Sequence, residues 1–464
     1  MAVRFSEEQI LKATSGRKLR AAGRSAFDAV STDTRALLPG CLFVALVGER
    51  FDAHAFVGQA AQAGAGGAVV REGFTPPEGL PEGFGLYEVP DTTRALGALA
   101  RFHRLRFQNP VGAVGGSNGK TTTKEMVAAI LETRGPALRT EGNFNNEIGV
   151  PLTLFRLEPK HVAAAIEMGM NHPGEMTRLA QIAQPDAAVL TVIQPEHLEG
   201  LGSLEGVARA EAELFRALPP TGVAVVNLDD PHLVAQSQGL ACRKLTFGHA
   251  AEADVRIARI ERLGRDGLRV TFAHEGREYT ARLSFLGDHN ATNAAAAFGL
   301  ARALGYSPEA CVTGLEAARP YARRLNLVDA AGGVMVLDDC YNANTASMTA
   351  ALDTVHGLAE AQKGRAIAVL GDMLELGPGE LDEHRKVGEY AGRTLAQVAF
   401  FGPRSRVARE EAGMGAHFTE VEPLLAWLRP QLQSGDVVLV KASRGMRLER
   451  VVEGLTGRAA GGGH

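Results

Sequence analysis

The sequence predicts an α/β protein of three domains, with a mainly parallel sheet in the middle of the chain. The first observation is length, because 464 residues are too many for one ordinary hydrophobic core. The second is that short apolar runs alternate with helix-like stretches from about residue 107, as is typical of parallel sheets covered by helices. The third is that this alternation restarts near residue 319.

Residues 1–106 are predicted to form a small α/β domain. They combine a helix-like start with the short apolar runs 41–48 and 67–70. An alanine- and arginine-rich helix is predicted over 93–107. Pro110 should end it, because the residue before a proline disfavours helical backbone angles.

Residues 107–318 should carry the mainly parallel sheet, with helices on both faces. Candidates for its buried strands are the apolar runs 111–114, 162–167, 187–193 and 222–228. High alanine content predicts a helix over 289–304.

Residues 319–464 are predicted to form a third domain with a nucleotide-fold-like, Rossmann-like arrangement. Its strand candidates are 334–339, 365–372, 397–402 and 436–443, with helices between them and a last helix near 445–455.

Composition excludes several classes of function. The formal net charge is −4, so the chain has no basic field for nucleic acid or anionic lipid, and any anion must be bound locally. The four cysteines are far apart and are typical of reduced thiols in a cytoplasmic protein. Neither a run of transmembrane length nor a signal peptide is predicted, so substrates should be met in the cytosol.

A glycine-rich loop between a strand and a helix is the strongest chemical signal. Its residues are Gly115, Gly116, Ser117, Asn118, Gly119, Lys120, Thr121, Thr122 and Thr123. Glycines let backbone N–H groups converge on phosphate oxygens, while the lysine reaches the terminal phosphates and the hydroxyl after it suits Mg²⁺. This predicts a central domain of the P-loop type. The alternative, a glycine-rich turn with a surface lysine, fits the strand–loop–helix context less well.

Acidic and basic side chains follow other predicted strands. Glu167 ends one strand and His197 follows the next, which places both at the edge where α/β sheets bind ligands. Taken singly, Glu167 is better interpreted as a solvated glutamate at a strand end and His197 as a structural histidine, but the two share a predicted rim with the phosphate loop. Asp338 and Asp339 end a strand of the third domain and suit metal, ribose or amine binding, or simply an acidic turn.

Cations and amides complete the candidate site. Lys441, Ser443 and Arg444 follow the last strand and suit a carboxylate or phosphate. Arg323 and Arg324 lie at the predicted boundary of the third domain. One of them is a candidate to swing onto a γ-phosphate, or the two form a solvated linker pair.

These residues resemble the Mur ligase family over nearly the whole chain. The matching stretches are 31–35 and 51–54 in the first domain; 116–123, 143–149, 167–169, 197–199 and 287–290 in the second; and DDCYNAN (338–344), LGDMLELG (370–377), His384 and KASR (441–444) in the third. DDCYNAN and LGDMLELG favour the D-alanyl-D-alanine-adding type, and the chain lacks the D-N-P-R stretch of the diaminopimelate-adding type.

The resemblance implies an ATP-dependent, Mg²⁺-requiring ligase of peptidoglycan precursor synthesis. It would join D-alanyl-D-alanine to UDP-N-acetylmuramoyl-tripeptide through an acyl phosphate, as a monomer in the cytoplasm. The implied catalytic residues are Lys120, Glu167, His197 and Arg324. The implied ATP-binding residues are Gly116, Ser117, Asn118, Gly119, Lys120, Thr121 and Thr122, with Asn290 on adenine and Asp338 on ribose. The implied substrate-binding residues are Ser31, Asp33, Thr34, Arg35, Asn145, Asn146, Asp339, Tyr341, Asn342, Asn344, Lys441, Ser443 and Arg444.

The implied metal ligands are Thr121, Glu167, His197 and Glu211. Glu211 lies where relatives carry a lysine that reacts with CO₂, and its carboxyl carbon reaches roughly 3–4 Å less far. Either its helix lies closer to the metal, or a water bridges the gap, or Glu211 is helical surface. Two other functions remain open: another Mur-type or folylpolyglutamate ligase, and a P-loop switch protein that hydrolyses ATP without ligation.

Overall fold

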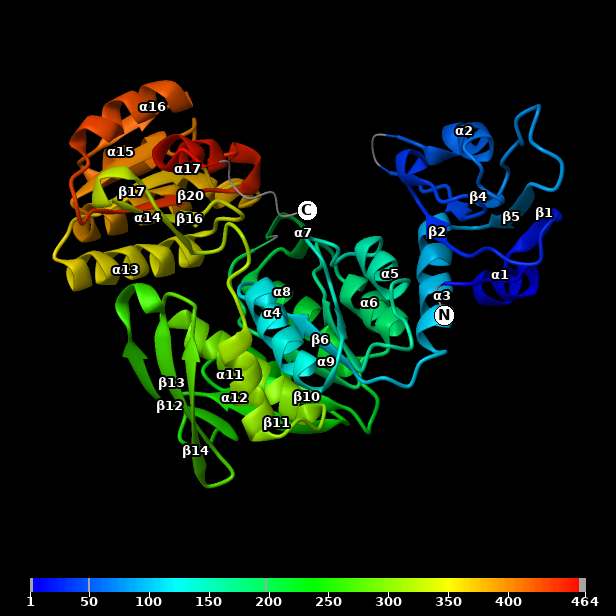
Figure 1. The fold of residues 1–464 in the computed structure, drawn as a ribbon, viewed down its shortest axis with the longest axis horizontal. Coiled ribbons are helices and arrows are strands. Elements are labelled where there is room, and N and C mark those ends of the chain that lie inside the picture. Colours follow the sequence, from blue (N-terminus) through cyan, green and yellow to red (C-terminus); the bar gives the residue numbers. More distant parts are fainter. Residues whose placement is uncertain (1–2, 49–50, 197, 459–464) are drawn as a thin grey trace.

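The computed structural model describes residues 3–48, 51–196 and 198–458. Within these residues the strands form three sheets covered by helices, and the first and third domains both lie against the central one (Figure 1). The α/β class and the mainly parallel sheets predicted from the sequence are confirmed. In this part of the chain no helix is both long enough and apolar enough to cross a membrane.

The N-terminal domain is built on a small sheet in which β1 is antiparallel to β5 and the other pairs are parallel. In spatial order its strands are β1 (Arg17–Arg20), β5 (Gly85–Val89), β4 (Gly67–Arg71), β3 (Leu42–Val44) and β2 (Val30–Ser31). Its helices are α1 (Glu7–Thr14), α2 (Val57–Gln62) and α3 (Thr92–Arg104).

Helix α3 connects this domain to the central one. Asp91 caps its start by accepting hydrogen bonds from the N–H groups of Thr93 and Arg94. Its apolar face, which includes Leu96 and Leu99, packs on α1 of the first domain and on α5 and α6 of the second. The helix is thus shared by two domains.

The central sheet places its strands in the order β14-β13-β12-β11-β10-β9-β6-β8-β7. The parallel part comprises β6 (Val111–Gly115), β7 (Ala137–Arg139), β8 (Ala163–Glu167), β9 (Ala187–Leu190), β10 (Val223–Asn227), β11 (Arg243–Gly248) and β12 (Val255–Arg262). Neighbouring residues of β6 belong to different cores, Ala113 to one and Val114 to the other, so both faces of the sheet are covered. The covering helices are α4 (Lys120–Leu131), α5 (Gly149–Leu154), α6 (Glu175–Ala183), α7 (Leu198–Leu201), α8 (Leu204–Glu211), α9 (Glu213–Arg216), α10 (Pro231–Gln236), α11 (His289–Ala303) and α12 (Pro308–Ala317).

An antiparallel extension of this sheet was not predicted. Strands β12, β13 (Leu268–His274) and β14 (Arg277–Leu283) form two successive hairpins. Figure 1 shows them projecting from the sheet beneath the C-terminal domain. The turn η4 (Gly264–Asp266) between β12 and β13 contacts α13 of that domain.

The C-terminal domain has a sheet of order β15-β16-β20-β17-β18-β19, in which β15 is antiparallel to β16 and the other pairs are parallel. Its strands are β15 (Asn326–Asp329), β16 (Met335–Asp339), β17 (Ala366–Gly371), β18 (Gln397–Phe401), β19 (Ala416–Phe418) and β20 (Val437–Lys441). Its helices are α13 (Thr345–Gln362), α14 (Glu380–Thr394), α15 (Arg406–Ala412), α16 (Val421–Leu428) and α17 (Glu449–Thr456).

The three domains are joined unequally. One hydrophobic cluster runs from Phe5 and Tyr87 of the first domain through α3 to Leu190 of the second. The C-terminal domain encloses two clusters of its own, to which the central domain adds Leu286. Its remaining contacts with the central domain include polar ones, such as the exposed ion pair between Arg265 and Asp329 at 3.1 Å.

Candidate functional site

The glycine-rich loop turns sharply between β6 and α4. Gly116 and Gly119 both have positive φ, 109° and 83°. A Cβ on either would lie 2.3 Å from a side-chain oxygen, of Thr191 and Asn293 respectively, so the loop requires glycine at both positions. Helix α4 begins without a side-chain cap, which leaves its first N–H groups free to bind an anion.

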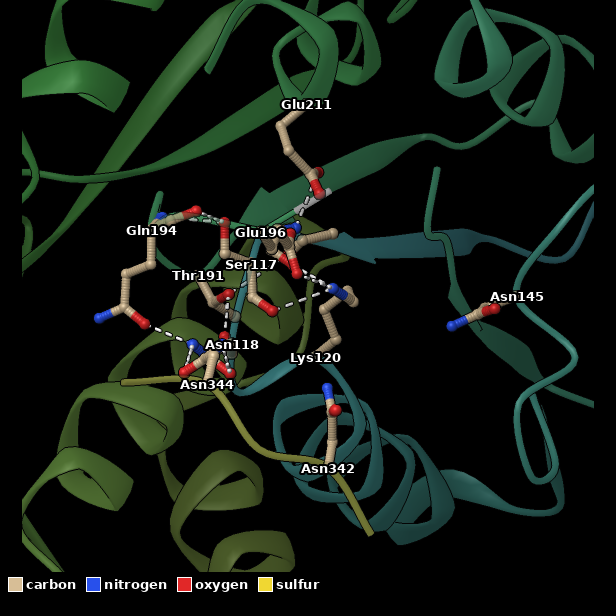
Figure 2. A network of polar contacts seen from close by, with 12 residues as sticks. Ser117, Asn118, Lys120, Asn145, Thr191, Gln194, Glu196, Glu211, Asn342 and Asn344 are labelled. Carbon is tan, nitrogen blue, oxygen red and sulfur yellow. Dashed lines mark hydrogen bonds and ion pairs between the residues drawn. The ribbon is translucent and has the colours of Figure 1, made fainter. Parts of the chain in front are cut away.

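Lys120 lies at the first position of α4, among three carboxylates. Its Nζ donates to the carbonyl oxygens of Gly116 and Ser117 and lies 3.8 Å from Glu196 (Figure 2). Burial disfavours the ammonium, but Glu196, Glu211 and Glu167 outweigh burial and raise the pKa of Lys120. Burial also raises the pKa of Glu196 to about 7. The site therefore holds a cation whose charge is favoured by its carboxylate neighbours, next to Glu196, whose charged form burial disfavours.

Glu167 ends β8 with one oxygen held and one open. Its Oε1 accepts a hydrogen bond of 2.9 Å from Asn145. Its Oε2 is buried and has no hydrogen-bond partner among the described residues. A buried carboxylate oxygen without a partner, on the same sheet edge as the Thr121 hydroxyl, suits Mg²⁺. In the described residues no group of three or more His, Cys, Asp or Glu side chains is arranged to hold a metal, and His197 lies outside them.

A cavity of about 730 Å³ opens beside the loop, between the central and C-terminal domains. The central domain contributes lining residues that include Asn118, Gly119, Thr122, Asn227, Asp229, Asp230, His232, Asn290 and Asn293. The C-terminal side contributes Arg324, Asp339, Asn342, Ser347, Ala350 and Lys441. A volume of this size suits a nucleotide-sized ligand bound next to the phosphate loop.

Adjacent acids in β16 have different surroundings. Asp339 lines the cavity, and its Oδ2 accepts a hydrogen bond of 2.6 Å from Lys441. Asp338 accepts from the N–H of Cys340 and is not among the residues that line the cavity. Of the two aspartates, Asp339 is therefore the one that lines the cavity. Asn290 lines the opposite wall, where its Oδ1 accepts a hydrogen bond from Asn293.

Other predicted site residues lie elsewhere. In the N-terminal domain Ser31, Asp33, Thr34 and Arg35 form a turn in which Asp33 caps the short helix 34–36 and pairs with Arg35. The Asn146 side chain accepts a hydrogen bond from the N–H of Gly149, the first residue of α5. Ser443 accepts from the Leu374 N–H. The structure thus divides the predicted residues into a phosphate cavity, a separate N-terminal turn and internal contacts.

Comparisons with known proteins match the whole of this architecture. The Mur ligase middle domain model matches residues 114–301, and the model named Mur ligase, glutamate ligase domain matches residues 323–444. A relative in Escherichia coli named UDP-N-acetylmuramoyl-tripeptide–D-alanyl-D-alanine ligase is 40% identical, over 92% of this chain and 93% of its own. The chain belongs to the Mur ligase family. A Bacillus subtilis relative of the same name is 36% identical to this Mur ligase, over 92% of each chain.

Solved structures agree with this family. MurF from Acinetobacter baumannii superposes on the Mur ligase with a TM-score of 0.91 at 33% identity, covering 98% of this chain and 100% of its own. MurF from Thermotoga maritima, solved in complex with ADP, gives a TM-score of 0.82 at 28% identity, covering 92% and 96%.

Two arginines at the domain junction of this Mur ligase have different partners. Arg323 lies 3.5 Å from Glu449 within the C-terminal domain. Arg324 donates to the Thr121 hydroxyl at 3.1 Å, and its guanidinium lies over the Tyr341 ring at 4.3 Å. The backbone on both sides of Arg324 is left-handed, with φ of 62° at Arg323 and 48° at Leu325. Of the two, Arg324 is the one that already contacts the phosphate loop.

Glu211 lies behind the phosphate loop. It is buried at the end of α8, with 1% of its surface exposed, so it is not part of the helical surface. Its Oε2 accepts a hydrogen bond of 2.8 Å from the Gly116 N–H (Figure 2). The shorter glutamate side chain therefore reaches the loop itself, and its charge acts on Lys120.

Several residues of the site were not predicted from the sequence. Gln194 and Glu196 follow β9 and approach the loop at Asn118 and Lys120. Asp230 accepts from the Ile193 N–H and also caps α10. A signal for them exists in their position, because each follows a buried parallel strand at the carboxyl edge of the sheet.

Proposed function

We propose that this Mur ligase uses ATP to join D-alanyl-D-alanine to UDP-N-acetylmuramoyl-tripeptide in peptidoglycan precursor synthesis, in the cytoplasm. The observation that carries the proposal is a phosphate loop that lines, through Asn118 and Gly119, a cavity shared with the C-terminal domain, with Lys120 directly after these residues. Relatives at 36–40% identity over nine-tenths of the chain carry the name of this activity.

In the proposed reaction a carboxylate oxygen of the tripeptide attacks the γ-phosphorus of ATP, and ADP leaves. The amine of D-alanyl-D-alanine then attacks the acyl phosphate, which releases phosphate and forms the amide. The protein positions groups and neutralises charge, as phosphoryl transfer requires. Lys120 would turn from its own loop carbonyls onto the β- and γ-phosphate oxygens, and Arg324 would leave the Thr121 hydroxyl for the γ-phosphate.

Mg²⁺ fits the residues present. Glu167 Oε2 and the Thr121 hydroxyl are oxygen donors next to the phosphate loop, and Glu211 adds a buried carboxylate behind it. When bound, the ion neutralises phosphate charge and orients the transferred group. Asn145 donates to the other oxygen of Glu167, which fixes the orientation of the carboxylate.

The second substrate has a candidate site on the C-terminal domain. Arg324 and Arg444 both lie over the ring of Tyr341, at 4.3 and 5.4 Å from its centroid. Lys441 is fixed by Asp339 and by the carbonyl of Asn342. With Arg324 committed to the γ-phosphate, Arg444 on the same aromatic ring offers a site for the carboxylate of a dipeptide.

Phosphate release is expected to require ATP, UDP-N-acetylmuramoyl-tripeptide and D-alanyl-D-alanine together. The physical reason is that closure of the C-terminal domain completes the site for the second substrate. Colorimetric phosphate assays with each component omitted in turn, and mass spectrometry of the product, would measure this. Equal ATP turnover without either peptide substrate would favour a switch protein that hydrolyses ATP, and turnover with an amino acid instead of the dipeptide would favour another ligase.

Glu211→Gln should raise the Mg²⁺ concentration for half-maximal activity by roughly tenfold. The amide retains an acceptor for the Gly116 N–H but removes the negative charge behind the loop. Because glutamate brings a permanent carboxylate, the parent enzyme should also be indifferent to bicarbonate. The matched control is Glu205→Gln, which removes a charge from the exposed side of the same helix. A parental Mg²⁺ titration for Glu211→Gln would show that this charge does not act on the metal.

A further inference from the structure

A pair of asparagine side chains joins the phosphate loop to the C-terminal domain. Nδ2 of Asn118 donates to Oδ1 of Asn344, and Nδ2 of Asn344 donates to Oδ1 of Asn118, both at 3.2 Å. The two residues are 226 positions apart in the chain. Figure 2 shows the two amides facing each other beside Lys120.

Asn118 is held on the side of the phosphate loop. Its carbonyl oxygen accepts a hydrogen bond of 2.5 Å from the Thr191 hydroxyl. Its amide also donates to the side chain of Gln194. Since Asn118 lies between Ser117 and Gly119, a movement of the loop on binding phosphate must move this amide.

Asn344 is held on the side of the C-terminal domain. It caps α13, where its Oδ1 accepts from the Ser347 N–H at 2.9 Å and its own N–H donates to the Ser347 hydroxyl. Helix α13 also contributes Ala346, Ser347 and Ala350 to the cavity wall. Asn344 therefore moves together with α13, the helix that forms this wall of the cavity.

We infer that Asn118 and Asn344 are positioning residues that couple the phosphate loop to closure of the C-terminal domain. The inference rests on the proposed function, in which closure of the C-terminal domain brings in the second substrate. Both hydrogen bonds act at contact distance only, so they exist in the closed arrangement and are lost together when the domains separate. If a nucleotide that fixes the loop shifts the equilibrium toward the closed arrangement, closure must by reciprocity raise the affinity for the nucleotide.

Neutral amides distinguish this contact from the ion pairs at the same junction. The Arg265–Asp329 pair is exposed, so salt screens it and it contributes little. The Asn118–Asn344 pair is partly buried and uncharged, so its effect should change little with ionic strength.

Asn344→Ser tests the inference without removing the helix cap. Serine caps a helix well but is too short to reach Asn118. We expect kcat/KM for D-alanyl-D-alanine to fall about tenfold, from the loss of two hydrogen bonds, while the midpoint of thermal unfolding stays unchanged. Asn344→Asp, which retains the cap and one of the two bonds, should recover part of this loss. Asp329→Asn, at the exposed ion pair, is the matched control and should stay within about twofold of the parent.

A double-mutant cycle and a structural measurement complete the test. The double variant Asn118→Ala/Asn344→Ser should lose no more kcat/KM than the more damaging single variant, because either substitution alone already removes the contact. Small-angle scattering with a non-hydrolysable ATP analogue should show a compact parent and a more extended Asn344→Ser variant. The inference would be overturned if the double variant lost as much activity as the product of the two single losses. It would also be overturned if the parent and Asn344→Ser gave the same scattering curve. The scattering arm needs no ligation, so failure of the proposed function would appear separately, as a parent enzyme that closes on nucleotide but forms no amide.

Discussion

Replacing Lys120 with alanine is expected to reduce phosphate release by about 10³-fold or more and to leave the fold intact. Lys120 begins α4 at the end of the phosphate loop, and its ammonium is kept charged by the surrounding carboxylates. It is thus the cation placed to neutralise the transferring phosphoryl group. The fold should tolerate its loss because Glu196, whose pKa is raised to about 7, can take up a proton when the cation is gone.

Steady-state phosphate release, circular dichroism and thermal unfolding would measure these effects together. Lys160→Ala is the control, since Lys160 is an exposed lysine that pairs only with surface Glu158 in the described structure. Lys120→Arg should not restore activity, because a guanidinium is larger than an ammonium and binds phosphate in a different geometry. If Lys120→Ala kept near-parental turnover, Arg324 would be the cation that neutralises the transferring phosphoryl group.

Glu167→Gln is expected to lower kcat by roughly 10²-fold at ordinary Mg²⁺ concentrations, with partial recovery at high Mg²⁺. The amide has the same size, and its oxygen can still accept from Asn145, so the loop should keep its geometry. What changes is the open oxygen Oε2, which loses its charge and can become an N–H₂ group.

Metal binding should be measured directly as well as through activity. Mn²⁺ binding followed by electron paramagnetic resonance, with ADP present, should weaken in Glu167→Gln. Glu158→Gln, which changes an exposed carboxylate paired with Lys160, serves as the control. If Glu167→Gln bound Mn²⁺ as the parent does, Glu167 would be a structural partner of Asn145 and not a metal ligand.

Much of the fold followed from apolar runs, and the exception has a physical reason. Strands such as β6 and β8 are buried throughout, so they appear in the sequence as continuous apolar segments. Strands β12 and β14 set exposed or half-buried residues among the buried ones, and arginine and glutamate occupy many of these positions, as in Arg256, Arg259 and Glu261. Such hairpins carry no continuous apolar run, which explains why they were not predicted.

The candidate site was predictable in its parts but not in its contacts. Strand ends located Lys120 and Glu167 at one edge of the sheet, because parallel strands bring their carboxyl ends together. Strand alternation implies that Asp338 and Asp339 face opposite sides, yet the sequence does not say which one meets the cavity. The pairing of Asn118 with Asn344 depends on how two domains meet, and no local pattern encodes it.

The shared core of the first two domains determines which parts of the protein unfold together. Because Phe5, Leu99 and Leu190 belong to one continuous apolar cluster, the N-terminal domain cannot melt without exposing the core of the central one. These two domains should form a single cooperative unit in calorimetry. The C-terminal domain, whose cores come almost entirely from its own residues, is free to melt as a second unit. Under thermal stress the enzyme would therefore lose one wall of its nucleotide cavity as a block, while the phosphate loop stays folded on the other.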